Sequence, residues 1–97
     1  MPYLISCDIE NDALRLKVAN RLLAAGCIRL QMSVFADPIP DTPYKELFKW
    51  LQQIAWAKDD SLFILNIGPD TLKKTLWLGK QVEDWPIIAD PPDALFI

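Results

Sequence analysis

Asp8 is the side chain best placed to carry chemistry in this sequence. It directly follows the apolar segment Tyr3–Cys7 and precedes a helix start signal at Asn11. Carboxylates at strand ends are frequent ligand positions, and a hard cation such as Mg²⁺ takes a few carboxylate oxygens and otherwise keeps water. One Asp per chain is too few for a cation site, whereas two copies related by a twofold axis supply two. The alternative is that Asp8 only accepts backbone N–H bonds at the turn.

Basic and polar side chains near Asp8 in the expected fold could contact phosphate groups. Arg15 lies one turn into the helix that follows Asp8, and Arg29 lies on a later strand. The forked donors of Arg suit phosphate oxygens. Ser33 and Phe35 lie further along the same strand and could help to shape a groove. The alternatives are a solvated surface for the basic residues and ordinary packing for Phe35.

Residue counts exclude several other chemistries. The 97 residues contain no His, which excludes Ser-His-Asp and Cys-His catalysis and His-ligated zinc. The two cysteines, Cys7 and Cys27, are too few for a Cys-only zinc site or a disulfide-rich scaffold, and we expect buried thiols. The three glycines are isolated, so no phosphate-binding Gly-rich loop is expected. Glu10 and Asp12 follow Asp8 at EF-hand spacing, but the Gly and distal Glu of that loop are missing.

The charge balance argues against a strong general nucleic-acid binder. Ten basic and 13 acidic residues give a net charge of −3, and residues 81–97 carry four acidic residues and no basic one. Strong phosphate binding needs clustered Lys and Arg. No apolar run approaches the roughly 18–20 residues of a membrane helix. Acidic residues also come too early for a secretory signal, so we expect a cytoplasmic protein with reduced thiols and no membrane contact.

The first half of the chain predicts a strand, a helix and then extended structure. The strand covers Tyr3–Ile9, and the helix extends from the N-cap Asn11 up to Gly26, which closes it. Alternation over Cys27–Ala36 predicts one strand, or two strands bent in the middle. It places Phe35 on a polar face, which is compatible with a partner surface.

The second half predicts a helix, a strand and an appendage. Thr42-Pro43 is a helix start signal, and the helix continues to about Ala57. The four Trp residues are expected mostly in the core or at its rim, and Trp77 and Trp85 in the appendage could instead anchor a protein partner. Ser61–Ile67 predicts a central strand that is apolar on both faces, and Thr71–Leu78 predicts a short helix. Two edge or exchanged strands are expected at Pro86–Ala89 and Ala94–Ile97.

Two amphipathic helices over one sheet in this order predict an α+β, ferredoxin-like fold. Residues 1–67 form the ferredoxin-like domain, and residues 68–97 form a C-terminal appendage. This fold alone says almost nothing about function.

Two linked segments resemble the signatures of the CRISPR-associated protein 2 family. Tyr3–Ile9 reads Tyr-Leu-Ile-Ser-Cys-Asp-Ile, and Arg29–Phe35 reads Arg-Leu-Gln-Met-Ser-Val-Phe. The resemblance is close over residues 2–36 and continues by element order to Ile67. Cys7 stands where the family usually has an aromatic residue.

The resemblance implies a homodimer in which Asp8 faces its mate across the twofold axis and shares Mg²⁺ or Mn²⁺. It implies a metal-dependent endonuclease of antiviral defence that acts on RNA or double-stranded DNA. Arg15, Arg29 and Ser33 would then contact nucleic acid. The family also forms the central dimer of the spacer-acquisition complex, beside the CRISPR-associated protein 1 integrase. The strand Ala94–Ile97 would pack on the partner protomer.

Three other functions remain open at this point. The uneven charge and the aromatic, Pro-rich tail also fit a non-catalytic scaffold that spans DNA and orients the integrase. A related toxin-type ribonuclease and a small regulatory ferredoxin-like domain share the same fold.

Overall fold

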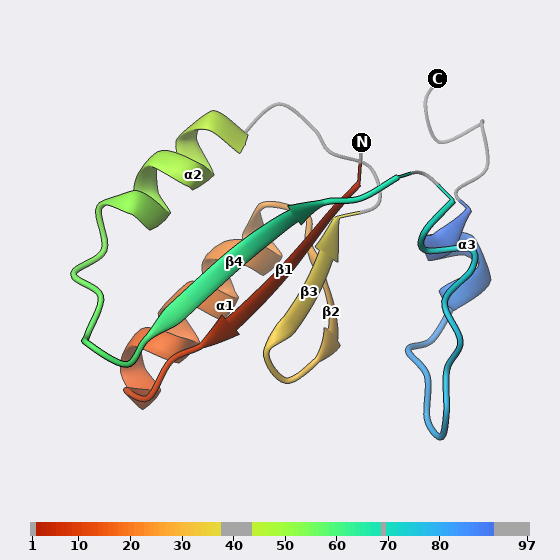
Figure 1. Cartoon of the computed structure of the whole chain (residues 1–97), viewed down its shortest axis with the longest axis horizontal. Helices are drawn as coiled ribbons and strands as arrows, with labels where there is room; N and C mark the ends of the chain where they lie inside the picture. The colour runs from red at the N-terminus through yellow and green to blue at the C-terminus, as the bar shows by residue number, and fades with distance from the viewer. Residues whose placement is uncertain (1, 38–43, 69, 91–97) are drawn as a thin grey trace.

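The computed structural model describes residues 2–37, 44–68 and 70–90. A four-stranded sheet and three helices form in these residues (Figure 1). In chain order the elements are β1 (Tyr3–Asp8), α1 (Asp12–Ala24), β2 (Ile28–Gln31), β3 (Val34–Asp37), α2 (Tyr44–Gln52), β4 (Ser61–Asn66) and α3 (Trp85–Ala89).

The sheet has the order β2-β3-β1-β4, and every neighbouring pair is antiparallel. β1 and β2 are therefore parallel with β3 between them, and α1 makes the crossover that joins them. Ile5 pairs with Phe35 on one side and with Ile64 on the other. This arrangement confirms the predicted α+β, ferredoxin-like fold.

The main core lies between the sheet and the helices α1 and α2. Ile5, Val18, Leu22 and Phe35 are fully buried in it, and Leu47 of α2 is nearly so. Among the described residues, no helix is both long and apolar enough to cross a membrane.

Helix α1 begins and ends where the sequence predicts. The side chain of Asn11 accepts a hydrogen bond from the backbone N–H of Leu14 at 2.9 Å. Gly26 follows the helix with φ +97°, a conformation that a residue without Cβ adopts at low cost.

Cys27–Ala36 forms a hairpin, which resolves the choice between one strand and two. β2 and β3 flank a turn at Met32 and Ser33, with a bulge between Arg29 and Gln31. The face that carries Phe35 turns toward the helices, and the Phe35 ring is fully buried. The expected partner surface at Phe35 is therefore wrong, because alternation separates two faces without saying which one the helices cover.

Helix α2 ends at Gln52 instead of near Ala57. The indole N–H of Trp56 donates to the carbonyl oxygen of Leu51 at 3.0 Å. This bond satisfies a carbonyl of the last turn, and the chain leaves the helix in a bend.

β4 lies at an edge of the sheet, so its predicted central position is wrong. Its helix-facing residues Leu62 and Ile64 pack against the core. On the opposite face, Phe63 and Leu65 remain 52% and 47% exposed. Among the described residues, nothing buries the Phe63 and Leu65 face of β4.

The appendage differs most from prediction. Residues 71–74 form turns instead of a helix, and the segment 86–89, predicted as a strand, lies in α3. Trp85 is buried, and its ring lies 5.2 Å from that of Trp77 in an edge-on arrangement. Together with Leu72 and Ala89 they form a second core against Ala36 of β3, so the two Trp rings are not free partner anchors. The segment Ala94–Ile97 lies outside the described residues.

Candidate active site

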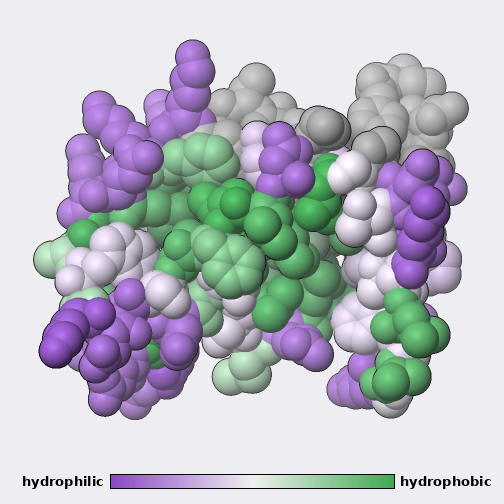
Figure 2. Space-filling model, viewed as in Figure 1, coloured by the Kyte–Doolittle hydropathy of each residue, from purple (hydrophilic) through white to green (hydrophobic). Residues whose placement is uncertain are grey.

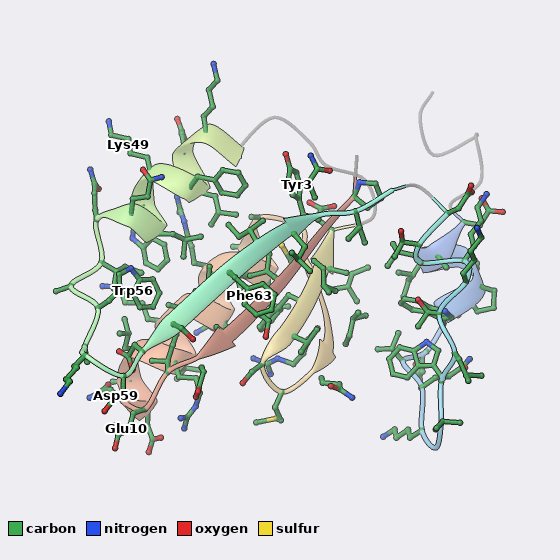
Figure 3. All side chains as sticks on the ribbon, in the orientation of Figure 1. Tyr3, Glu10, Lys49, Trp56, Asp59 and Phe63 are labelled. Carbon is green, nitrogen blue, oxygen red and sulfur yellow. The ribbon has the colours of Figure 1, made fainter. Side chains whose placement is uncertain are left out.

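Asp8 is exposed at the end of β1, on the sheet face opposite the helices. Cys7 is buried toward the helices, so alternation turns Asp8 the other way, on the same face as Leu4 and Ser6. Asp8 pairs with Ser61 at the start of β4, and Ser6 pairs with Phe63. Asp8 therefore shares a face with the exposed apolar side chains of β4, and Phe63 points out from this face in Figure 3.

Neighbouring side chains, and not Asp8, bind the backbone of the turn after β1. Asn11 caps α1, and the guanidinium Nη1 of Arg15 donates to the carbonyl oxygen of Ile9 at 2.9 Å. The other guanidinium nitrogen of Arg15 pairs with Asp12. Within the described part of the chain, the Asp8 carboxylate forms no hydrogen bond or ion pair. Its lone pairs therefore remain available to a ligand.

Arg29 and Ser33 approach the same end of β1 from the hairpin. The backbone carbonyl of Ser33 accepts hydrogen bonds from the N–H of Cys7 at 3.0 Å and from its thiol at 3.6 Å. The Arg29 guanidinium lies over the Phe35 ring, 5.2 Å from its centroid. Its Nε is buried and has no hydrogen-bond partner among the described residues.

The charged side chains of Arg29, Asp8 and Arg15 lie close enough to the Cys7 thiol to influence its pKa. Burial raises this pKa, Arg29 opposes the rise, Asp8 adds to it, and Arg15 opposes it. The structure thus brings Asp8, Arg15, Arg29 and the Ser33 backbone together around one buried thiol.

The residues of one chain do not make a complete cation site. No group of three or more metal-binding side chains occurs within residues 2–37, 44–68 and 70–90. Asp12 starts α1 and pairs with Arg15, which fits its predicted place in the first helical turn. Among the described residues, Asp8 is the carboxylate on the open face of β1 that has no hydrogen bond or ion pair.

Asp60 belongs to this region and was not among the site residues predicted from the sequence. Its carboxylate accepts the backbone N–H of Glu10 and that of Ala57, both at 3.1 Å. Glu10 and Asp60 lie 50 positions apart. No local pattern signals such a contact, because it depends on the pairing of β1 with β4.

The family model of CRISPR associated protein Cas2 matches residues 1–75 of this chain. The chain belongs to the Cas2 family. This finding confirms the resemblance carried by Tyr3–Ile9 and Arg29–Phe35, and the match ends within the appendage.

Relatives of the Cas2 family align over most of their own length. A protein of Aeropyrum pernix named CRISPR-associated endoribonuclease Cas2 is 36% identical over 81 residues, which cover 84% of this chain and 88% of the relative. A Synechocystis protein, CRISPR-associated endoribonuclease Cas2 3, is 32% identical over 97 residues, with 98% and 97% covered.

A solved structure shares the Cas2-like fold seen in this chain. It is the crystal structure of a hypothetical protein from Thermus thermophilus, with a TM-score of 0.67 and 25% identity. The alignment covers 84% of this chain and 93% of that one.

Proposed function

We propose that this Cas2 chain is a metal-dependent endonuclease that cleaves phosphodiester bonds as a homodimer in the spacer-acquisition step of CRISPR immunity. RNA is the first substrate to test, because the relatives are named endoribonucleases, and double-stranded DNA is the second. The observation that carries the proposal is that Asp8 shares an open sheet face with Phe63 and Leu65.

The open face supports a dimer formed by a second copy of the chain. Figure 2 presents the middle of this face as a hydrophobic area, to which Phe63 and Leu65 of β4 contribute. Contiguous apolar surface of this kind marks an interaction site, and a twofold axis is the commonest way to cover it. Because Asp8 lies on the same face, stacking two copies about such an axis brings the two Asp8 carboxylates toward each other.

A pair of Asp8 carboxylates suits Mg²⁺ or Mn²⁺. Both ions are hard cations that accept carboxylate oxygens and keep water as further ligands. A bound divalent cation supplies activation of water and stabilises negative charge on the phosphate. The two Asp8 side chains would hold the ion. Arg15, Arg29 and Ser33 are proposed to contact the nucleic-acid backbone around the end of β1, where Arg29 extends from the helix-covered face and Asp8 from the open one.

The unpaired edge of β4 offers a second contact between the two protomers. β4 has a described neighbour, β1, on one side only. The apolar segment Ala94–Ile97 is the part of the chain proposed to pair with this edge on the partner. Pairing between this segment and β4 of the partner would also cover an edge strand that is otherwise open to aggregation.

Arg29 is the proposed phosphate contact whose guanidinium keeps hydrogen-bonding capacity, since its Nε has no partner among the described residues. We expect Arg29→Gln to weaken RNA binding by roughly 5- to 10-fold and to lower the slope of log affinity against log salt by about 1. Fluorescence anisotropy at several salt concentrations measures both.

The control for Arg29→Gln is Lys74→Gln, which removes the same charge from an exposed position in the appendage. Equal losses of affinity in the two variants would mean that Arg29 contributes only to the general charge of the protein.

The enzyme proposal is tested on the wild-type protein. We expect labelled RNA or duplex DNA to be cleaved in Mg²⁺ or Mn²⁺, and cleavage to stop when the ion is removed by EDTA and to return when it is restored. Gel analysis of the products measures this. Full activity in EDTA would contradict a metal-dependent site.

The second candidate is a non-catalytic scaffold that spans DNA beside the CRISPR-associated protein 1 integrase. The observation in its favour is the turn of the appendage, where Leu76 and Leu78 are 81% and 86% exposed. Two neighbouring apolar side chains so exposed suit contact with another protein. Spacer integration by a protein without cleavage activity would favour this candidate.

A further inference from the structure

Asp60 links the two chain segments that flank the proposed active site. Oδ1 of Asp60 accepts the backbone N–H of Glu10, in the turn between β1 and α1, at 3.1 Å. Oδ2 accepts the backbone N–H of Ala57, in the connection between α2 and β4, also at 3.1 Å. One carboxylate therefore joins segments that are far apart in sequence. Figure 3 shows the same junction, where the labelled residues Glu10 and Asp59 lie close together.

This junction begins where the sheet ends. The last pair of the β1–β4 ladder is Asp8 with Ser61. Asp60 directly precedes Ser61, and Glu10 comes two residues after Asp8. Beyond that pair, the hydrogen bond from Glu10 to Asp60 is the contact that continues to hold the two strands together. It therefore acts on the backbone that carries Asp8.

The other side-chain hydrogen bonds at the turn come from the start of α1. Arg15 binds the Ile9 carbonyl and Asn11 caps the helix, so both fix the turn relative to α1. Among the hydrogen bonds of the described residues, the Asp60 bond is the one that ties the turn to the segment entering β4, and the buried side chain of Ile9 adds packing in the core that Leu62 and Ile64 share. The ladder ends at Asp8 and Ser61, so this bond supports the position of Asp8 at the point where the pairing of the two strands stops.

We propose that Asp60 is a positioning residue that holds Asp8 in place against β4 for cation binding and cleavage. This inference rests on the proposed nuclease function. A carboxylate suits the role because it has two acceptor oxygens, and here each receives one backbone N–H. An Asn side chain has the same size but only one acceptor oxygen, so it releases either Glu10 or Ala57.

The experiment compares Asp60→Asn with Asp59→Asn and the wild type. Asp59 is an exposed neighbour of equal charge that makes neither of these hydrogen bonds. We expect kcat to fall by about 10- to 100-fold in Asp60→Asn with KM within about twofold, because a small displacement of a reacting group costs rate more than binding. Asp59→Asn should keep the kcat of the wild type.

A second measurement reads the link directly, without nuclease activity. Amide hydrogen exchange of Glu10, followed by NMR, should become at least about fivefold faster in Asp60→Asn and stay unchanged in Asp59→Asn. Asp60→Glu keeps two acceptor oxygens, so it should restore most of the protection at Glu10 and most of the lost kcat. A general loss of stability would not be restored in this way.

The outcomes separate this inference from the proposed function. Faster exchange at Glu10 with kcat equal to that of Asp59→Asn would overturn the positioning role and leave the nuclease proposal standing. Unchanged exchange in Asp60→Asn would show that the link is not made, and would also overturn the inference. A wild-type protein that cleaves nothing in Mg²⁺ or Mn²⁺ would instead remove the nuclease proposal, and the role of Asp60 with it.

Discussion

Asp8→Ala is expected to lose at least about 100-fold in the kcat of divalent-cation-dependent cleavage, which corresponds to about 2.7 kcal/mol of transition-state stabilisation. In the proposed dimer the substitution removes both carboxylates that hold the ion, because each protomer contributes one. Asp8 is exposed and its side chain binds no described residue, so the fold should remain intact. Initial rates on RNA and duplex DNA, with circular dichroism as a check of folding, measure the effect.

Glu10→Ala is the matched control for Asp8→Ala. Glu10 is exposed and carries the same charge two residues later, and its backbone N–H still reaches Asp60 after the substitution. Its kcat should stay within about twofold of the wild type, as expected for a surface change away from the reacting groups. If Asp8→Ala were as active as Glu10→Ala, cleavage would not depend on Asp8. Integration assays with the same two variants then test the scaffold role, which should survive both.

Phe63→Asp is expected to convert the dimer into monomers at micromolar concentration. Phe63 is 52% exposed at the middle of the open sheet face, and the variant would place an unpaired carboxylate there in each protomer. Burying such a charge costs several kcal/mol, which raises the dimer dissociation constant by at least about 100-fold. Analytical ultracentrifugation measures the dissociation constant. Cleavage should fall in parallel, since a monomer holds only one Asp8.

Leu76→Asp is the control for Phe63→Asp. Leu76 is 81% exposed. Its replacement also exchanges an exposed apolar side chain for a carboxylate, but it lies in the appendage and not on the sheet. This variant should remain dimeric. A dimer that persists in Phe63→Asp would show that the two copies do not meet through this face, and the pairing of the two Asp8 carboxylates would lose its basis.

Local signals predicted the elements that depend on local chemistry. Asn11 and Gly26 set the ends of α1 through capping and a positive φ, and neither depends on the rest of the chain. The alternation in Arg29–Phe35 likewise predicted that Arg29 and Phe35 share a face, but the bulge after Arg29 moves Gln31 to the other face, where it pairs with Val34. It could not predict that the face with Arg29 and Phe35 lies inside, because the order of the strands decides which face the helices cover.

Long-range features could not be predicted in the same way. The apolar character of β4 on both faces indicated a central strand, yet β4 lies at the edge and exposes Phe63. A single sequence does not distinguish burial within one chain from burial between two copies. Asp60 was missed for a related reason, since its partner Glu10 comes close only when β1 pairs with β4. The role of Asp8 remains a prediction.

The appendage limits where a facing sheet can approach. Ala36 of β3 pairs with Leu4 of β1 and lies on the face opposite the helices, where Leu72 and Trp85 cover it. In Figure 1 this segment stands beside the β2 side of the sheet, opposite β4. In the proposed dimer, a second sheet would therefore cover β1 and β4 but would meet this segment over β3, so the two sheets would be offset from each other. The segment would then limit sliding between the two sheets, and a fixed offset is what a site shared between two chains requires.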